Sequence, residues 1–182
     1  MSGAGAAPSA PAGPHALARE GPIKSKLHKQ HRWLKRLLGD WSHEMEANMG
    51  PDKPPARFKG TERVRAIGDL WIVAEGRCPT PRGGTATMIL TLGYDPATKR
   101  FVGTWIGSMM SHLWIYDGAL SRDGTTLTLN TVGPNIALKG KTAAYREVIR
   151  FKNRNHRVFT SSMRDQRGKW IKFVTAHHRR KK

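Results

Sequence analysis

Short segments with the period-two alternation of β-strands recur along most of the chain, and turn signals separate them. The turns are rich in the Gly, Asp and Asn residues that reverse a chain, as at Gly68-Asp69 and Asp123-Gly124. Ten short strands joined by tight hairpins favour an all-β fold, a single up-and-down antiparallel β-barrel, because closure leaves no exposed edge. The expected strands cover roughly residues 40–49, 56–67, 70–77, 85–94, 100–108, 112–119, 125–132, 144–152, 156–163 and 169–179.

Only the N-terminal part departs from this pattern. Residues 1–22 are rich in Ala, Gly and Pro, so they are expected to form a disordered tail ahead of a β-barrel domain over residues 23–182. Residues 24–38 predict a short helix that Gly39 ends. The apolar side chains of this segment fall near one helical face: Leu27, Trp33, Leu34, Leu37 and Leu38.

The formal net charge of +19 raises the question of nucleic-acid binding. The excess lies at the two ends, because residues 1–36 carry +6 and residues 150–182 carry +11, whereas residues 37–149 carry +2. The terminal run Arg179-Arg180-Lys181-Lys182 is typical of a solvated tail. Electrostatic binding of nucleic acid through the basic termini is therefore an alternative function and not the leading one.

The single cysteine, Cys78, excludes an internal disulfide and favours a reducing, cytoplasmic setting. The first residues show no basic segment followed by an apolar one, so no secretory signal is expected. No apolar run is long enough to predict a membrane-spanning helix.

Strand alternation assigns an unusual number of polar side chains to the barrel interior. The expected inward set is His43, Glu62, Glu75, His112, Tyr116, Glu147 and His177. A two-residue loop at Gly68-Asp69 would place Glu62 opposite Glu75. Two carboxylates at that distance are expected to titrate as a coupled pair, with one protonated near neutral pH unless a cation or a basic group lies between them.

Two interpretations of this inward set remain open. The acids either pair with Arg77, Arg179 or a histidine and close the barrel, or they line a hydrated cavity that binds a small, partly polar and cationic molecule. The ligand-binding interpretation is the leading hypothesis. Trp105 is its main apolar candidate, because Gly103 and Gly107 would leave room for a ligand beside that ring.

The sequence contains no recognisable catalytic motif, and it does not identify a cofactor. An enzyme is a second hypothesis, in which Glu62 or Glu75 with a raised pKa acts as a general acid or base beside His112 or His43. A metal site is not predicted, because these residue types occur without a recognised ligand spacing.

The segment Leu38-Gly39-Asp40-Trp41, which follows the predicted helix and opens the first strand, resembles the Gly-x-Trp signature of lipocalins and other calycins. In those barrels an Arg of the last strand packs over the Trp. The resemblance assigns that role to Arg179, with Arg180 as the second choice.

Longer stretches resemble a bacterial family known as domain of unknown function 1579, over about residues 27–182. They are Trp33-Leu34, Leu38-Gly39-Asp40-Trp41, Met49-Gly50-Pro51-Asp52, Phe58-Lys59-Gly60-Thr61-Glu62, Leu92-Gly93-Tyr94-Asp95-Pro96, residues 101–110, residues 113–118 and Thr175-Ala176-His177-His178-Arg179-Arg180. The resemblance implies a calycin-like barrel in a bacterial, cytoplasmic protein and implies no activity. Nitrobindin-like barrels, which are similar in outline, hold haem through a histidine near the C-terminus, and that resemblance would assign the role to His177.

Overall fold

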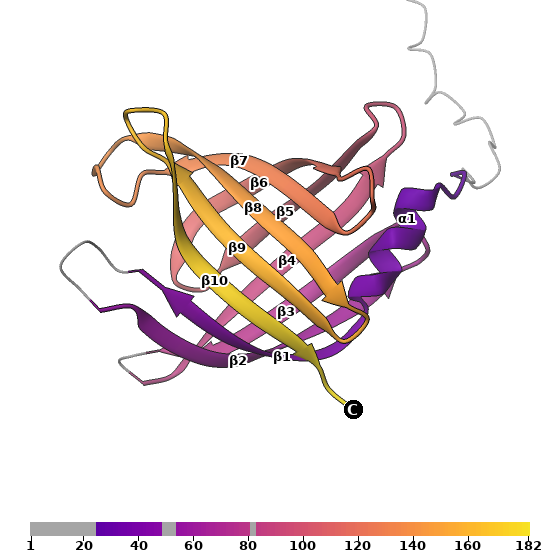
Figure 1. Ribbon diagram of the computed structural model, residues 1–182, viewed down its shortest axis with the longest axis horizontal. Coiled ribbons are helices and arrows are strands. Elements are labelled where there is room, and N and C mark those ends of the chain that lie inside the picture. Colours follow the sequence, from indigo (N-terminus) through magenta and orange to yellow (C-terminus); the bar gives the residue numbers. More distant parts are fainter. Residues whose placement is uncertain (1–24, 49–53, 81–82) are drawn as a thin grey trace, which may run out of the picture.

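Ten antiparallel strands and one short helical segment make up the computed structural model, which describes residues 25–48, 54–80 and 83–182 (Figure 1). The expected disordered tail, residues 1–22, lies outside the described residues. The helix α1 spans Lys29–Leu34 and runs into a 3-10 turn, Lys35–Leu37. The strands are β1 Gly39–Ala47, β2 Ala56–Ile67, β3 Trp71–Pro79, β4 Thr85–Asp95, β5 Arg100–Gly107, β6 Met110–Leu120, β7 Thr126–Pro134, β8 Thr142–Asn153, β9 His156–Arg164 and β10 Trp170–Arg180.

The strands form one closed barrel in which each strand pairs with its neighbour in the sequence and β1 pairs with β10. This confirms the prediction of a single up-and-down barrel of about ten strands. Alternation along each strand separates a buried inner face from an exposed outer face, as in β1, where Trp41 and His43 are buried while Asp40 and Ser42 are exposed. The core therefore lies inside the barrel.

The helical segment closes one end of the barrel (Figure 1). It is shorter than predicted. Of the apolar face expected for it, Trp33, Leu34 and Leu37 are buried in the barrel core, whereas Leu27 precedes the helix and is exposed. The Trp33 indole donates a hydrogen bond to the Gly124 carbonyl at 2.8 Å, which joins this segment to the turn before β7. The opposite end of the barrel carries no helix in the described chain.

Trp41, directly after the helical segment, is the most buried large side chain, with 0% exposure. Its indole donates to the Leu37 carbonyl at 2.8 Å. The Arg180 guanidinium lies over the same ring at 4.2 Å and donates to the carbonyls of Leu38 and Arg36. The preference for Arg179 in this role was therefore wrong, and the second choice, Arg180, occupies the position.

The physical reason is a β-bulge in β10. The pairing of β10 with β9 shifts by one residue between Lys172 and Val174, so the alternation reverses beyond that point. His178 and Arg180 point inward as a result, and His177 and Arg179 point outward. The prediction that His177 faces the interior was wrong for this reason.

A second one-residue shift occurs at the hairpin between β2 and β3. The loop contains three residues, Gly68 to Leu70, and Gly68 adopts a left-handed φ of 56°. Glu62 therefore pairs with Gly76, and Glu75 pairs with Arg63 on the outer face. The predicted opposition of Glu62 and Glu75 was wrong, because it assumed a two-residue loop.

The packing around Trp41 generates a test of stability. Replacing Arg180 with Ala removes two hydrogen bonds and a cation–π contact, so we expect the free energy of unfolding to fall by about 2 kcal/mol. Replacing the adjacent, outward Arg179 with Ala serves as the control and should change it by less than about 0.5 kcal/mol. Urea unfolding followed by Trp fluorescence measures both. Equal losses in the two variants would contradict the inward position of Arg180.

Candidate functional site

A buried ion pair crosses the barrel interior. Arg157 of β9 donates a hydrogen bond to the carboxylate of Glu62 on β2, and their side chains are only 4% and 15% exposed. The strands β2 and β9 are separated in the sheet by β1 and β10, so this contact joins parts of the wall that are not hydrogen-bonded to one another. The guanidinium of Arg157 also lies 4.7 Å from the ring of Trp41.

Two histidines lie beside this ion pair. His43 and His178 face each other with ring centroids 5.0 Å apart, and the Nε2 atom of His178 lies 4.0 Å from Glu62 Oε1. Burial lowers the pKa of His43, where Glu62 acts in the opposite direction and Arg157 reinforces the effect. Burial, together with Arg157 and His43, lowers the pKa of His178 well below its usual range. Both rings are therefore neutral at pH 7, and their Nδ1 atoms are buried without a hydrogen-bond partner in the described chain.

A second polar group lies on strands β6, β8 and β9. The hydroxyl of Ser161 donates to Glu147 Oε1 at 2.8 Å, while Glu147 Oε2 is buried without a partner among the described residues. Burial raises the pKa of Glu147 to about 7, and the Ser161 hydrogen bond only partly offsets that effect. Burial, and the nearby Glu147, raise the pKa of the Tyr116 hydroxyl. Around neutral pH this carboxyl is therefore half protonated, able to donate or accept a hydrogen bond.

Several apolar side chains between these polar groups are only half-buried, although they sit at inward positions. They are Met45, Phe58, Met88, Leu90, Trp105, Phe159 and Phe173. An inward side chain of a closed barrel stays accessible where the interior, or an end of the barrel that no helix covers, is not filled. The arrangement leaves apolar surface within the barrel next to neutral polar groups.

The predicted reason for placing a ligand at Trp105 does not hold. A side chain on Gly107 would collide with the Trp105 ring and the Met109 sulfur, and one on Gly103 would collide with the backbone of β4 at Thr91. These glycines thus permit close packing and do not leave open space. Trp105 nevertheless faces inward, and it pairs with Trp114 across the hairpin of β5 and β6.

Six of the eight predicted site residues face the barrel interior. His43 and Glu62 lie together, as do Tyr116 and Glu147. Trp105 and His112 also face inward, and His112 packs edge-on against Trp114 with centroids 4.9 Å apart.

Glu75 and His177 do not belong to the interior. Glu75 pairs with Arg77 at 2.7 Å on the outer face, and the ring of His177 lies 3.1 Å from that of His156, also outside. The suggestion of haem ligation through His177 fails on the same observation, because that ring cannot reach the inside of the barrel.

Sequence reasoning missed Arg157, His178 and Ser161. Alternation along residues 156–163 assigns Arg157, Phe159 and Ser161 to one face of the strand. Because Phe159 is apolar, it indicates that this face is the inward one, so the positions of Arg157 and Ser161 could have been predicted. The inward position of His178 could not be predicted from alternation, because no turn residue in the sequence signals the bulge at Phe173.

The arrangement does not support acid–base catalysis by Glu62. Its hydrogen-bond partner is Arg157, and the distance of 4.0 Å from its carboxylate to His178 is too long for a hydrogen bond. Among the described residues no group of three or more His, Cys, Asp or Glu side chains is placed to hold a metal ion.

The ion pair can be tested by a change that leaves Arg157 buried without its counterion. We expect Glu62→Gln to lower the free energy of unfolding by about 3 kcal/mol, since breaking one side of a buried pair is strongly destabilising. Glu75→Gln is the matched control, because Glu75 is 42% exposed and pairs only with Arg77, and it should change stability by less than about 0.5 kcal/mol. Denaturant titration of the two variants at pH 7 provides the measurement. A stabilised Glu62→Gln protein would show that the pair is not formed.

The raised pKa of Glu147 predicts a pH-dependent stability. The folded barrel holds a proton that the unfolded chain releases between its ordinary pKa of 4.5 and about 7. The contribution of Glu147 is therefore fully present below pH 4.5 and is lost as pH rises through 7, by up to about 3 kcal/mol. We expect the stability of the wild-type protein relative to Glu147→Gln to decrease over that range in urea unfolding. A difference that is constant with pH would contradict a buried, protonatable Glu147.

Comparison with known proteins places this geometry in context. No curated protein sequence shows significant similarity to the chain. Among solved structures, the crystal structure of Rv2717c from M. tuberculosis has a TM-score of 0.64 at 14% identity, and the match covers 86% of this chain and all of that one. The S-type phycobiliprotein lyase CPES from Guillardia theta has a TM-score of 0.53 at 15% identity, with 86% of this chain and 94% of that one covered. At such identities the likeness shows a shared barrel fold.

No helix among the described residues is long and apolar enough to cross a membrane. The profile of one sequence family, described as "Protein of unknown function (DUF1579)", matches residues 26–180, which include the helical segment, Trp41, both interior polar groups and Arg180. The chain belongs to that family.

Proposed function

We propose that this protein is a binding module that holds a small molecule inside its barrel. The observation that carries the proposal is the half-exposure of inward apolar side chains such as Met88, Leu90 and Phe159, which lie in the same interior as two buried polar groups. A pocket that is mainly apolar and has a few fixed polar groups is the usual form of a small-molecule site.

The polar groups define which ligands fit. Glu62 is already neutralised by Arg157, and the pKa of Glu147 near 7 leaves that carboxyl about half protonated at neutral pH. The cationic ligand expected from a pair of opposed glutamates therefore loses its support. The unpartnered Nδ1 atoms of His43 and His178, and Oε2 of Glu147, favour a largely apolar molecule that carries one or two uncharged hydrogen-bonding groups.

A reducing, cytoplasmic setting is part of the same proposal. Cys78 is the only cysteine of the chain and is buried in β3, and burial raises the pKa of its thiol. A protonated, buried thiol is poorly reactive, which fits an incidental residue more closely than a catalytic one.

The proposal predicts binding of an uncharged, apolar fluorescent probe, N-phenyl-1-naphthylamine, that depends on interior space. We expect Met88→Trp, which adds volume at an inward position of β4, to weaken probe binding at least tenfold. Ile89→Trp is the matched control, because Ile89 is the next residue and points to the outer face, and we expect its affinity to stay within twofold of the wild type. Fluorescence titration measures both affinities.

Thermal unfolding establishes that both variants are folded at the temperature of the titration. A probe bound equally well by the two variants, or a wild-type protein that binds no probe, would contradict an interior site. If Met88→Trp fails to fold, a medium-chain alcohol such as 1-decanol is titrated against the probe bound to the wild-type protein. Displacement of the probe supports an interior site, and the absence of displacement contradicts it.

A further inference from the structure

The outer wall of the barrel divides into a charge-balanced part and a cationic part. On β1 and β2 the exposed acids and bases alternate across the sheet and form ion pairs: Asp40 with Arg63, Glu44 with Lys59, and Glu46 with Arg57. Strands β7 to β10 contain a single acidic residue, Glu147, and it points into the barrel. The outer face of these four strands is therefore cationic, and an acid outside the strands, Asp123 of the turn before β7, interacts with Arg150.

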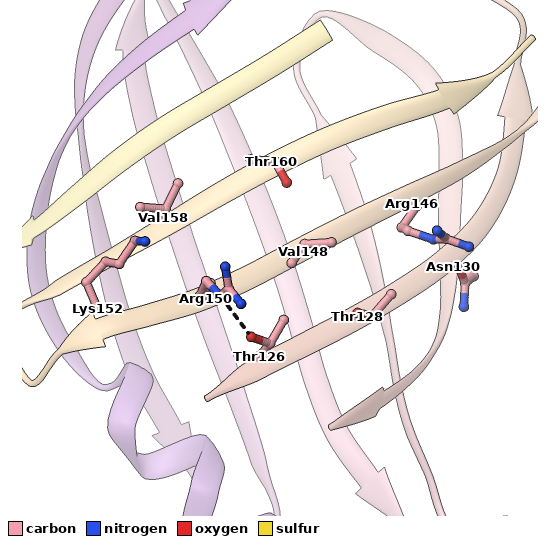
Figure 2. A pocket seen from close by; sticks show the side chains of 9 residues that line it. All are labelled: Thr126, Thr128, Asn130, Arg146, Val148, Arg150, Lys152, Val158 and Thr160. Atoms are coloured by element: carbon pink, nitrogen blue, oxygen red, sulfur yellow. Dashed lines mark hydrogen bonds between the residues drawn. The ribbon is translucent and has the colours of Figure 1, made fainter. Parts of the chain in front are cut away.

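Part of this cationic wall is hollowed. A depression of about 580 Å³ lies on the outer face of β7, β8 and β9. Arg146, Arg150 and Lys152 line it along β8 (Figure 2). Three hydroxyl side chains, Thr126, Thr128 and Thr160, lie beside them. Outward residues of one strand recur about every 6.6 Å, so Arg150 and Lys152 are neighbours in this row, and Val148 separates them from Arg146.

An aromatic ring extends this row toward β10. The guanidinium of Arg146 lies 4.1 Å from the ring of Trp170, and its Nε atom has no hydrogen-bond partner in the described chain. Arg150 Nε donates to Thr126 Oγ1 at 3.3 Å, which leaves its terminal nitrogens toward solvent. A planar cation stacked on an indole beside a row of positive charges is the combination that binds unstacked bases together with their phosphates.

We propose that the outer face of β7 to β9, with Trp170, binds single-stranded nucleic acid. The phosphates would lie along the row of Arg146, Arg150 and Lys152, with the threonine hydroxyls as additional donors, and a base would stack at the Arg146–Trp170 pair. The apolar side chains of the depression, Val148 and Val158, are half-buried and do not project as membrane anchors do. The inference is independent of the interior ligand.

The location differs from the basic termini that charge counting indicated. Arg180 packs over Trp41 and donates hydrogen bonds to two backbone carbonyls, so it is not part of a solvated tail. Of the twelve basic residues within 150–182, five stand on the outer face of β8 to β10: Arg150, Lys152, Arg164, Lys172 and Arg179.

The test is a fluorescence-anisotropy titration of the full chain with a labelled single-stranded oligonucleotide of about 12 nucleotides, over a range of salt concentrations. We expect Arg146→Ala, Arg150→Ala and Lys152→Ala combined to weaken binding at least tenfold. The slope of log affinity against log salt should fall by about 2, because three phosphate contacts are lost. The matched control combines Arg57→Ala, Arg63→Ala and Arg65→Ala on β2, which removes the same charge from the balanced wall and should leave affinity within twofold.

A second variant separates stacking from charge. Trp170→Leu should weaken binding at least fivefold with little change in the salt slope, because this variant loses a base contact but keeps every phosphate contact. If the triple variant does not fold, Lys152→Glu at an exposed position should still weaken binding several-fold.

Three results would overturn the proposal. One is an equal loss of oligonucleotide affinity in the two triple variants, which would mean that the net charge of the protein alone attracts the oligonucleotide. Another is the absence of binding at low salt. The third is binding to phosphatidylserine vesicles without binding to the oligonucleotide, which would make the wall a membrane-facing surface.

Discussion

The packing of Arg180 over Trp41 is the interaction on which the rest of the barrel depends. Trp41 opens the first strand and Arg180 ends the last, so their contact fixes the seam where β1 meets β10 and the sheet closes. The same guanidinium binds the carbonyls of Arg36 and Leu38 and so holds the helical segment across the barrel end. Because the seam fixes the register of β10, it also decides that His178, and not His177, reaches the interior ion pair.

The fold could be predicted from the sequence, whereas the candidate site could be predicted only in part. Strand number and closure follow from alternation and turns, which are local signals, and both are confirmed. The site depends on register, and a slip of one residue moves every side chain of a strand to the other face. One such slip, at the loop Gly68 to Leu70, moved Glu75 outside; another, at the bulge of Phe173, exchanged His177 for His178 and Arg179 for Arg180. His43, Glu62 and Glu147 were placed correctly because no irregularity separates them from the residues that set their phase.

The interior keeps its polar groups by neutralising them in three different ways. Glu62 is neutralised by Arg157, the two histidines are neutral because burial lowers their pKa, and burial raises the pKa of Glu147 to about 7. Each solution reduces the cost of burying charge, and each leaves an atom without a partner: Arg157 Nε, the two Nδ1 atoms and Glu147 Oε2. Unsatisfied buried atoms are uncommon in folded proteins, so these atoms are the structural feature that the proposed ligand would explain.

The outer wall solves a different problem with the same strands. Because successive side chains point to opposite faces, β8 can place Glu147 inside while Arg146, Arg150 and Lys152 stand outside. Substitutions on one face therefore leave the packing of the other largely unchanged. The balanced ion pairs of β1 and β2 show that a basic barrel of this kind can pair its surface charges, and yet β7 to β10 provide no acid to do so. Repulsion among Arg146, Arg150 and Lys152 costs stability, so a wall that retains them, beside a stacked Arg and Trp, is better explained by an anionic partner than by folding.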